Sequence, residues 1–510
     1  MATNDMPPSP LEPKKAWWRE LTRYHWFVLI VAALGWLFDC LDQQLFILAR
    51  PAAMRDLISG TPEMTPAELD LSRRNYADLA TSIFIAGWAM GGLIFGMLGD
   101  RIGRAKTMVI TILMYSLFTG LSSFSVGFWD FAFYRFLTGL GVGGEFAVGV
   151  ALVAEVMPDR ARAGSLSALQ ALSAFGNVAA AMINLGLGVA EEKGLVTSPW
   201  RTMFLIGAAP ALLALVVRWK LKEPEKWKKA SHDDVVKKKL GSYRELFSDP
   251  TLRKHALLGL LLGCSGIIGL WTVGFFTPDL IGYVQRKSVT EIVFTEQLDA
   301  ARQANDAAQI ARLEQVRAAV EDARLTDTFD DATKEVKKSV DGAINGRLSA
   351  WRSYVSLAIN FGAFLGMFGF GYLAQRIGRK KTFVVGLLSA FFSTIAVFLF
   401  LQEMWQVWVM VPLMGFCQLS LFAGYAIYFP ELFPTRLRST GTSFCYNVGR
   451  FLAALGPIMK AGLERLFMDP NAEDKLEAVR FAGATMCCVF LIGLFVLPFL
   501  PETHGKPLPE

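Results

Sequence analysis

One short basic segment occurs twice in this chain, each time between two long apolar runs. GMLGDRIGRAK at 96–106 returns as GYLAQRIGRKK at 371–381, about 275 residues later. Two hydrophobic helices joined by the same turn in both halves of a chain indicate a membrane protein built from two related units. The copies differ where Asp100 of the first is replaced by Gln375 in the second.

The apolar runs define the class of protein. Hydrophobic residues make up 53% of the 510 residues and charged residues 19%, a composition that disfavours an ordinary soluble domain. A helix needs roughly 20 apolar residues to cross a hydrocarbon core of about 30 Å. We expect twelve membrane-spanning helices, at 26–49, 75–98, 106–126, 129–156, 162–190, 200–218, 255–283, 354–375, 381–401, 405–430, 438–462 and 479–500.

The net charge of +6 lies mostly in alternate connections between these runs. Loops retained in the cytoplasm carry such an excess of Lys and Arg, so we attribute the charge to topology and not to nucleic-acid binding. The pattern predicts a multi-pass protein of the cell (inner) membrane with both termini in the cytoplasm. The polar start of the chain lacks the features of a cleavable signal, so we expect the first apolar run to remain as a helix.

The predicted fold is an all-α membrane protein with twelve transmembrane helices in two six-helix bundles and a helical external insert between helices 7 and 8. In the insert, Leu298, Ile310, Leu313, Val316 and Val320 predict helices with a modest apolar stripe and no function of their own. The predicted segments are a cytoplasmic tail at 1–25, a bundle at 26–218, a cytoplasmic linker at 219–254, a bundle at 255–500 that includes the insert at 286–351, and a cytoplasmic tail at 501–510.

A second pair of segments is duplicated in the same register. EVMPDRARAG at 155–164 closes the fourth run, and ELFPTRLRSTG at 431–441 closes the tenth. The Pro-Glu turns LKEPEKW and LPETHGK follow the sixth and twelfth runs. The two halves are therefore related along their length, and a substrate path is expected between them near the membrane midplane.

These motifs resemble the major facilitator superfamily, with RFLTGLGVGGEF at 135–146 similar to its helix 4 motif. The resemblance covers nearly the whole chain except the N-terminal tail and the insert. It implies a secondary transporter that works by alternating access, and not an enzyme. The GGE of helix 4 and ELFPTRLRSTG favour the metabolite and organic-acid proton symporters, whereas the PETHGK tail favours the sugar porters.

Four charged residues in apolar runs are candidates for proton coupling. Asp39 and Asp42 in FDCLDQQLF resemble the Asp-x-x-Asp element of proton symporters for aromatic acids and sialic acid, with Cys40 where those families usually have Gly. A charge at mid-membrane costs about 2.5–3.5 kcal/mol on insertion scales, so such carboxylates are protonated, paired or beside water. Arg135 is a candidate partner for a helix 1 carboxylate, and Glu145 is a second proton site. A fixed salt bridge or a structural cap is the alternative.

A set of polar side chains in the apolar runs forms the candidate substrate site. Arg450 lies well inside the eleventh run, where its forked guanidinium suits a substrate carboxylate; the alternative is a structural partner such as Glu431. Uncharged hydrogen-bonding groups at this depth usually face the bundle interior. The remaining candidates are Gln170, Asn177, Asn360, Gln418, Tyr425 and Asn447.

The two basic segments are candidates for gating. We expect Asp100 to accept hydrogen bonds from the N-terminus of a neighbouring helix, and Arg101 and Arg104 to pair with Glu155. Gln375 cannot supply the charge that Asp100 does. In the second half, we expect Arg376 and Arg379 to pair with Glu431.

The leading functional hypothesis is proton-coupled uptake of a small organic anion, such as a carboxylate or sugar acid. A sugar or polyol proton symporter is the first alternative, and a non-transporting nutrient receptor is an alternative of another class. We expect a small-molecule substrate, protons, the lipid bilayer, a monomer, no cofactor and no metal, because the cysteines and histidines show no metal-ligand spacing.

Overall fold

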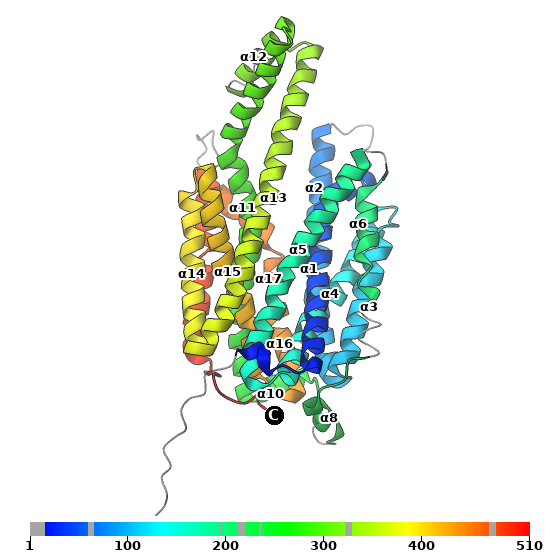
Figure 1. The fold of residues 1–510 in the computed structure, drawn as a ribbon, viewed down its shortest axis with the longest axis vertical. Helices are drawn as coiled ribbons and strands as arrows, with labels where there is room; N and C mark the ends of the chain where they lie inside the picture. The colour runs from blue at the N-terminus through cyan, green and yellow to red at the C-terminus, as the bar shows by residue number, and fades with distance from the viewer. Residues whose placement is uncertain are drawn as a thin grey trace, which may run out of the picture.

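The computed structural model describes residues 16–59, 66–192, 195–212, 220–233, 237, 239–321, 329–468 and 476–510. All regular elements within these ranges are helical. The long helices stand side by side, and a helical insert projects from one end of the molecule (Figure 1). We call that end the insert end. The opposite end, where α8 (Glu225–His232), α10 (Tyr243–Ser248) and the C-terminus lie, is called the linker end.

The first half of the chain supplies one bundle. Its elements are η1 (Trp17–Glu20), α1 (Arg23–Leu57), α2 (Pro66–Arg101), α3 (Arg104–Ser122), α4 (Phe128–Val156), α5 (Asp159–Glu192) and α6 (Pro199–Gly207). The sixth predicted run, 200–218, is described only as far as residue 212, and α6 covers its first part.

The second half supplies the other bundle and the insert. Its elements are α11 (Pro250–Gln303), α12 (Ala307–Glu321), α13 (Asp331–Ile377), α14 (Arg379–Phe400), α15 (Met404–Leu432), η3 (Thr435–Leu437), α16 (Arg438–Asn447), α17 (Gly449–Ala453), α18 (Gly456–Phe467), α19 (Leu476–Met486), α20 (Val489–Val496) and η4 (Leu497–Phe499). The predicted all-α fold with an insert between the seventh and eighth spans is confirmed.

Ten helices among the described residues are long and apolar enough to cross a membrane. The eleventh predicted run, 438–462, is a helix in three pieces, α16, α17 and α18. Pro457 stands at the start of α18, where its missing N–H is not needed by a continuing helix. Broken helices at membrane depth are tolerated where protein or a cavity surrounds the freed backbone groups.

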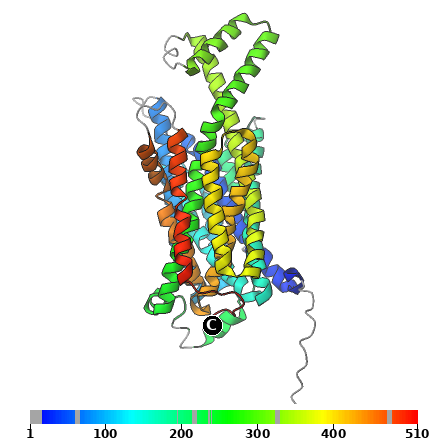
Figure 2. The same cartoon turned by 90° about the vertical axis from the view of Figure 1, so that its left-hand side faces the viewer.

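The insert is a continuation of two membrane helices, as Figure 2 shows. α11 runs for 54 residues and α13 for 47, so neither stops at the predicted end of its span. Leu298, Leu313 and Val316 pack into a separate small core with residues of α13. Val320 is 58% exposed and does not belong to the predicted apolar stripe.

The bundles meet through close helix packing. α16 lies against α2 and α4, and α13 lies against α5. Three glycines of α2 make the first contact possible, because an added Cβ at Gly92, Gly96 or Gly99 would lie within 2.3–2.7 Å of a side chain of α16. Those side chains are Asn447, Ser443 and Ser439, spaced four residues apart. Small residues on one helix therefore admit a polar stripe from the other bundle.

Candidate functional site

Asp42 of α1 forms an ion pair inside the N-terminal bundle. Its Oδ1 accepts a hydrogen bond from Thr119 Oγ1 and lies 3.5 Å from Arg135 Nη1. Both charged side chains are fully buried. A pair this buried needs further hydrogen bonds to compensate for lost hydration.

Arg135 of α4 donates those further hydrogen bonds to acceptors in its own bundle. Its guanidinium donates to Ser122 Oγ at 2.8 Å and to Thr138 Oγ1 at 3.0 Å. The guanidinium carbon also lies 4.6 Å from the centre of the Phe204 ring, a cation–π contact. Arg135 is thus fixed among α3, α4 and α6 and reaches α1 through Asp42.

Two further carboxylates lie beside this pair with few partners. Neither oxygen of Asp39 has a hydrogen-bond donor among the described residues. Glu145 of α4 accepts a hydrogen bond from Thr111 Oγ1 at 2.7 Å, and its other oxygen is unpaired. The charges of Glu145 and Asp42 act on Asp39. Of these three buried carboxylates, only Asp42 forms an ion pair among the described residues, and its partner is Arg135.

The absence of a side chain at Gly35 leaves room for the Glu145 carboxylate. An added Cβ at this position of α1 would lie 2.3 Å from Glu145 Oε1. The glycine lets the carboxylate of α4 lie directly on the backbone of α1, one turn from Asp39. Because Gly35 has no side chain, Glu145 of helix 4 can lie close to Asp39 of helix 1.

Arg450 lies in the broken eleventh helix, on the short segment α17. Its Nη1 donates to Tyr446 O at 2.8 Å and to Asn447 Oδ1 at 2.9 Å. The guanidinium carbon lies 4.3 Å from the ring centre of Trp88 and 4.4 Å from that of Tyr446. Among the described residues, no carboxylate lies within ion-pair distance of Arg450, which is 2% exposed. Glu431, its predicted structural partner, pairs with Arg379 instead.

Five of the six uncharged candidates divide into two groups, those bonded across the bundles and those bonded within one. Asn177 Nδ2 donates to Asn360 Oδ1 at 2.9 Å and joins α5 to α13, and Asn447 Nδ2 donates to Gly143 O at 3.3 Å across the bundles. Gln418 donates to Thr394, and Tyr425 donates to Leu262 O at 2.9 Å, both within the C-terminal bundle. Gln170 Oε1 is buried without a donor among the described residues.

Glu155 lies between arginines of the two bundles at the linker end. Its Oε1 is 2.8 Å from Arg104 Nη2 and 2.8 Å from Arg438 Nη1. Arg438 also donates to Pro509 O at 2.7 Å, so the C-terminal tail reaches the same point. One carboxylate therefore joins α3, α4 and α16.

Asp100 supplies a second bond between the bundles. Its oxygens accept from the backbone N–H of Ser439 at 3.1 Å and of Thr440 at 2.8 Å, and from the Thr440 hydroxyl at 2.6 Å. These N–H groups belong to the first turn of α16, which has no earlier carbonyl to pair with. The carboxylate thus caps a helix of the other half.

Of these ion pairs, the second half repeats the one within its own bundle. Arg379 forms a bidentate pair with Glu431, with nitrogen to oxygen distances of 2.8 Å and 3.2 Å. Two predicted pairings are wrong. Arg101 donates to Leu240 O at 3.3 Å and not to Glu155, and Arg376 lies 4.2 Å over the Tyr372 ring and not beside Glu431. Arg101 and Arg376 follow Asp100 and Gln375 directly, so they point to another side of the helix.

A further pair of acids was not among the sequence candidates. Glu223 accepts from the backbone N–H groups that open α3, with Arg104 N at 2.7 Å, and Glu502 accepts from Arg379 N at 3.0 Å at the start of α14. The preceding residues, Gly103 with φ 114° and Gly378 with φ 94°, adopt a left-handed backbone that favours glycine. The Pro-Glu turns after runs six and twelve were the signal that pointed to this repeat.

The environment of Glu502 differs from that of a free carboxyl group. Partial burial raises its pKa, but backbone N–H donors from His504, Arg379, Lys380 and Thr503 outweigh burial and leave the pKa below its usual value. The ionised form of Glu502 is therefore the form that caps α14.

The duplicated motifs identify a known family. The sequence profile of the Major Facilitator Superfamily matches residues 27–294 and 346–510, which leaves out part of the insert. The chain belongs to the major facilitator superfamily. It is accordingly a multi-pass membrane transporter and not an enzyme.

Similar proteins agree with this assignment. A putative metabolite transport protein of Haemophilus influenzae is 27% identical over 494 residues, which cover 96% of this superfamily member and 99% of that protein. A probable 4-methylmuconolactone transporter of Cupriavidus pinatubonensis is 26% identical, with coverage of 92% and 89%. The proton:xylose symporter XylE from E. coli has the same fold, with a TM-score of 0.67, 16% identity and coverage of 95% and 98%.

Proposed function

We propose that this transporter takes up a small organic anion together with protons. The two bundles would rock about the substrate so that it is exposed first at the insert end and then at the linker end. In this proposal the linker end is cytoplasmic, as the distribution of Lys and Arg predicts. The substrate would bind between the bundles, at Arg450.

Arg450 is the observation that carries the proposal. A buried guanidinium normally has a carboxylate partner, since an uncompensated buried charge is costly. Arg450 has aromatic rings and neutral acceptors around it instead. The break between α16 and α18 lies at the same point, and transporters of this kind bind substrates at discontinuous helices. A substrate carboxylate would complete the charge balance.

The acids of the N-terminal bundle are the proposed proton sites. Ionising Asp39, Asp42 and Glu145 together would be costly, because in the described part of the chain only Asp42 has an arginine partner. Protonation would reduce the excess negative charge and permit the substrate anion to approach Arg450. Protonation of Asp42 would break its ion pair with Arg135. Because Asp42 lies on helix 1, proton binding would then be coupled to movement of that helix.

The first experiment identifies the substrate class. Purified protein is screened for thermal stabilisation by carboxylates, sugar acids, and neutral sugars and polyols, because a ligand stabilises the folded state by mass action. We expect stabilisation by a carboxylate, and we expect Arg450→Gln to abolish it. Arg450→Lys should restore little, since a lysine lacks the planar fork of two donors. Carboxylate binding that survives in Arg450→Gln would reject the anion site.

The second experiment tests coupling with the ligand found in the first. In proteoliposomes, an inward proton gradient should accelerate uptake by the wild type. Asp42→Asn should lose this acceleration yet retain exchange of labelled for unlabelled substrate, which requires no net proton movement. Asp39→Asn and Glu145→Gln, measured in the same way, show which acid carries the proton. Uptake by the wild type that ignores the pH gradient would reject proton coupling.

A neutral sugar or polyol is the second candidate substrate. The likeness of fold to the proton:xylose symporter XylE favours it, whereas the charge of Arg450 does not. Stabilisation by a sugar that is unchanged in Arg450→Gln would select this alternative. A ligand that binds without any uptake or exchange would select the non-transporting receptor.

A further inference from the structure

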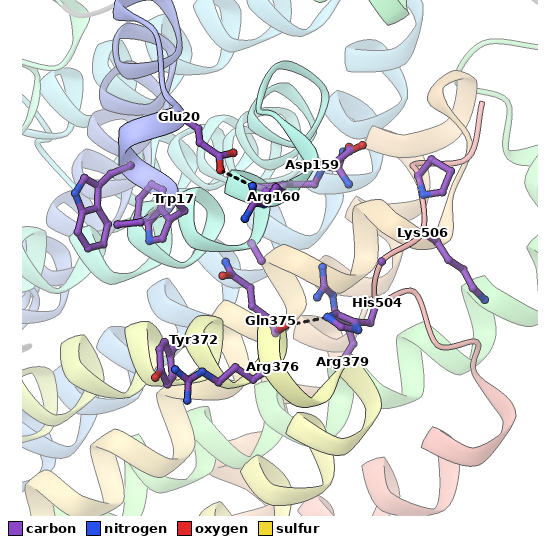
Figure 3. Close-up of a pocket in the computed structure, with 16 residues that line it drawn as sticks. Trp17, Glu20, Asp159, Arg160, Tyr372, Gln375, Arg376, Arg379, His504 and Lys506 are labelled. Atoms are coloured by element: carbon purple, nitrogen blue, oxygen red, sulfur yellow. Dashed lines mark hydrogen bonds and ion pairs between the residues drawn. The ribbon is translucent and has the colours of Figure 1, made fainter. Parts of the chain in front are cut away.

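A cleft of about 1080 Å³ opens at the linker end between the two bundles. It is lined by η1 and the start of α5 from the first half, and by the end of α13 and the C-terminal tail from the second half. Figure 3 shows Arg160, Gln375 and Arg376 lining it, with Trp17 and Tyr372 on one side and Lys506 on the other. The cleft is not part of the proposed transport path.

The equivalent position in the other half of the duplicated fold is filled by the linker, whereas this cleft is open. Its wall residues Arg160, Gln375 and Arg376 are the counterparts of Arg436, Asp100 and Arg101. The linker fills the first-half junction, because Gly241 N donates to Arg436 O at 3.0 Å and Leu240 O accepts from Arg101 at 3.3 Å.

The described tail covers only part of the second-half junction. His504 Nε2 lies 2.9 Å from Gln375 O, and the cleft beside it is open.

The charge of the cleft favours an anion, because its lining holds the two acids Glu20 and Asp159 and five basic residues, namely Arg160, Arg162, Arg376, Arg379 and Lys506. Asp159 pairs with Arg162. Arg376 has no carboxylate partner among the described residues, and its guanidinium lies over the Tyr372 ring. Arg160 pairs with Glu20 at 3.2 Å, but its side chain is 64% exposed, so this pair is weak and open to exchange. Lys506 is exposed on the tail. Gln375 adds no negative charge where the other junction has Asp100.

An exposed apolar stripe leads along α13 to the same arginine. Phe361, Leu365, Phe368 and Tyr372 are 65%, 45%, 37% and 58% exposed. Their spacing of three and four residues places them on one face of the helix, and Arg376 follows four residues later. At the mouth of the cleft, Trp18 of η1 is 52% exposed, and tryptophans are enriched where a membrane meets water.

We propose that the cleft binds an anionic phospholipid. The phosphate group would lie between Arg160 and Arg376, and an acyl chain would follow the exposed stripe of α13. Basic pockets between membrane helices bind such head groups, and the stripe distinguishes a lipid from a soluble phosphate. Because both bundles supply walls of the cleft, the lipid binds this arrangement of the bundles in preference to one in which the linker end is open.

Native mass spectrometry of the full-length protein in mixed phosphatidylglycerol and phosphatidylethanolamine tests the charge. Arg376→Gln and Arg160→Gln should each reduce retained phosphatidylglycerol by about fivefold, the effect of one basic residue at an anionic surface. Arg253→Gln is the matched control, since Arg253 is exposed at the start of α11 and outside the cleft. If Arg376→Gln and Arg160→Gln retained as much phosphatidylglycerol as the control Arg253→Gln, the proposal would be overturned.

Two further measurements separate a lipid from a soluble anion. Leu365→Ser should reduce retention without a change of charge, whereas Leu117→Ser, on a side chain 57% exposed on α3, should not. Inorganic phosphate alone should not raise the thermal midpoint of the wild type. Stabilisation by phosphate that Arg376→Gln removes would assign the cleft to a soluble anion and reject the lipid. Retention unaffected by Leu365→Ser would reject the acyl chain on the stripe of α13.

Discussion

The two copies of the basic segment have the same local structure and different roles between the bundles. In each copy a glycine with positive φ ends one helix, a glutamate from the end of that half caps the next, and an arginine pairs with a buried glutamate. These contacts stay within one bundle. They explain why the motif is repeated, because each bundle needs the same tight turn.

The difference lies in what each copy contacts in the other half. Asp100 caps α16, and Glu155 holds Arg438 as well as Arg104. Gln375 lies in an open cleft, and Glu431 contacts Arg379 and the tail residue Thr503. We therefore expect the polar contacts that close the linker end to come from the first copy, whereas the polar contacts of the second copy stay within its own bundle.

Loss of the shared carboxylate should have the largest effect. Glu155→Gln leaves Arg438 as a buried charge without a carboxylate, a loss of about 3–5 kcal/mol for a broken buried pair. We expect a lower thermal midpoint and an open linker end, seen as a longer distance between spin labels at Lys106 and Lys381. Glu431→Gln should lower the midpoint without lengthening that distance. Equal lengthening in both variants would mean that the copies do not differ.

Glycine substitutions test a position where the copies should behave alike. A Cβ at Gly96 would lie 2.4 Å from Ser443 Cβ, and one at Gly371 would lie 2.0 Å from Ser167 Oγ. Overpacking of this kind costs about 1–3 kcal/mol, so Gly96→Ala and Gly371→Ala should both lengthen the label distance. Gly186→Ala is the control, because nothing lies within 4 Å of its added Cβ. An effect confined to Gly96 would show that only α2 and α16 close the linker end.

The charge of Asp100 should matter less than the glycine contacts. Asp100→Asn retains one acceptor oxygen but loses the charge, a change of about 1–2 kcal/mol, or roughly five- to thirty-fold in the closed population. Gln375→Asn should leave that population unchanged. Populations come from the label distances at Lys106 and Lys381. If Gln375→Asn changed the closed population as much as Asp100→Asn, the two junctions would contribute equally to closure.

The glutamate caps should give the smallest and most equal effects. Glu223→Gln and Glu502→Gln should each cost about 0.3–1 kcal/mol at pH 7, the usual value of a charge at a helix N-terminus. Because the pKa of Glu502 is lowered in the folded state, its contribution is complete above its unfolded pKa of about 4.3 and is lost as the pH falls through the folded pKa. Thermal midpoints of wild type and Glu502→Gln measured from pH 7 to pH 3 should converge. A constant difference would exclude the ionised cap.

The sequence predicted local partners better than distant ones. Arg104 with Glu155 and Arg379 with Glu431 were predicted because both members of each pair belong to duplicated motifs in one bundle. Arg438 with Glu155 was not, since its partner lies 283 residues away in the other half. The predicted domain limits at 26–218 and 255–500 remain predictions, as do the roles of the transport and gating residues.

Several polar residues could not be sorted by sequence alone. Gln418 and Tyr425 bond to neighbouring helices of their own bundle, whereas Asn177 and Asn360 bond to each other across the bundles. Hydropathy gives the depth of such a residue but not the helix that it faces. Helix 11 was likewise predicted as one span, because its break depends on how α16 and α17 pack.

The amino-acid sequence by itself determined the family, the helical spans and the duplicated turns. These follow from hydrophobic length, positive charge and glycine at a left-handed position, which are properties of neighbouring residues. The tertiary structure alone decided that Asp100 and Glu155 join the bundles while Gln375 borders a cleft. The physical reason is that a buried charge is stable only beside its partner, and the partner comes from the other half of the chain.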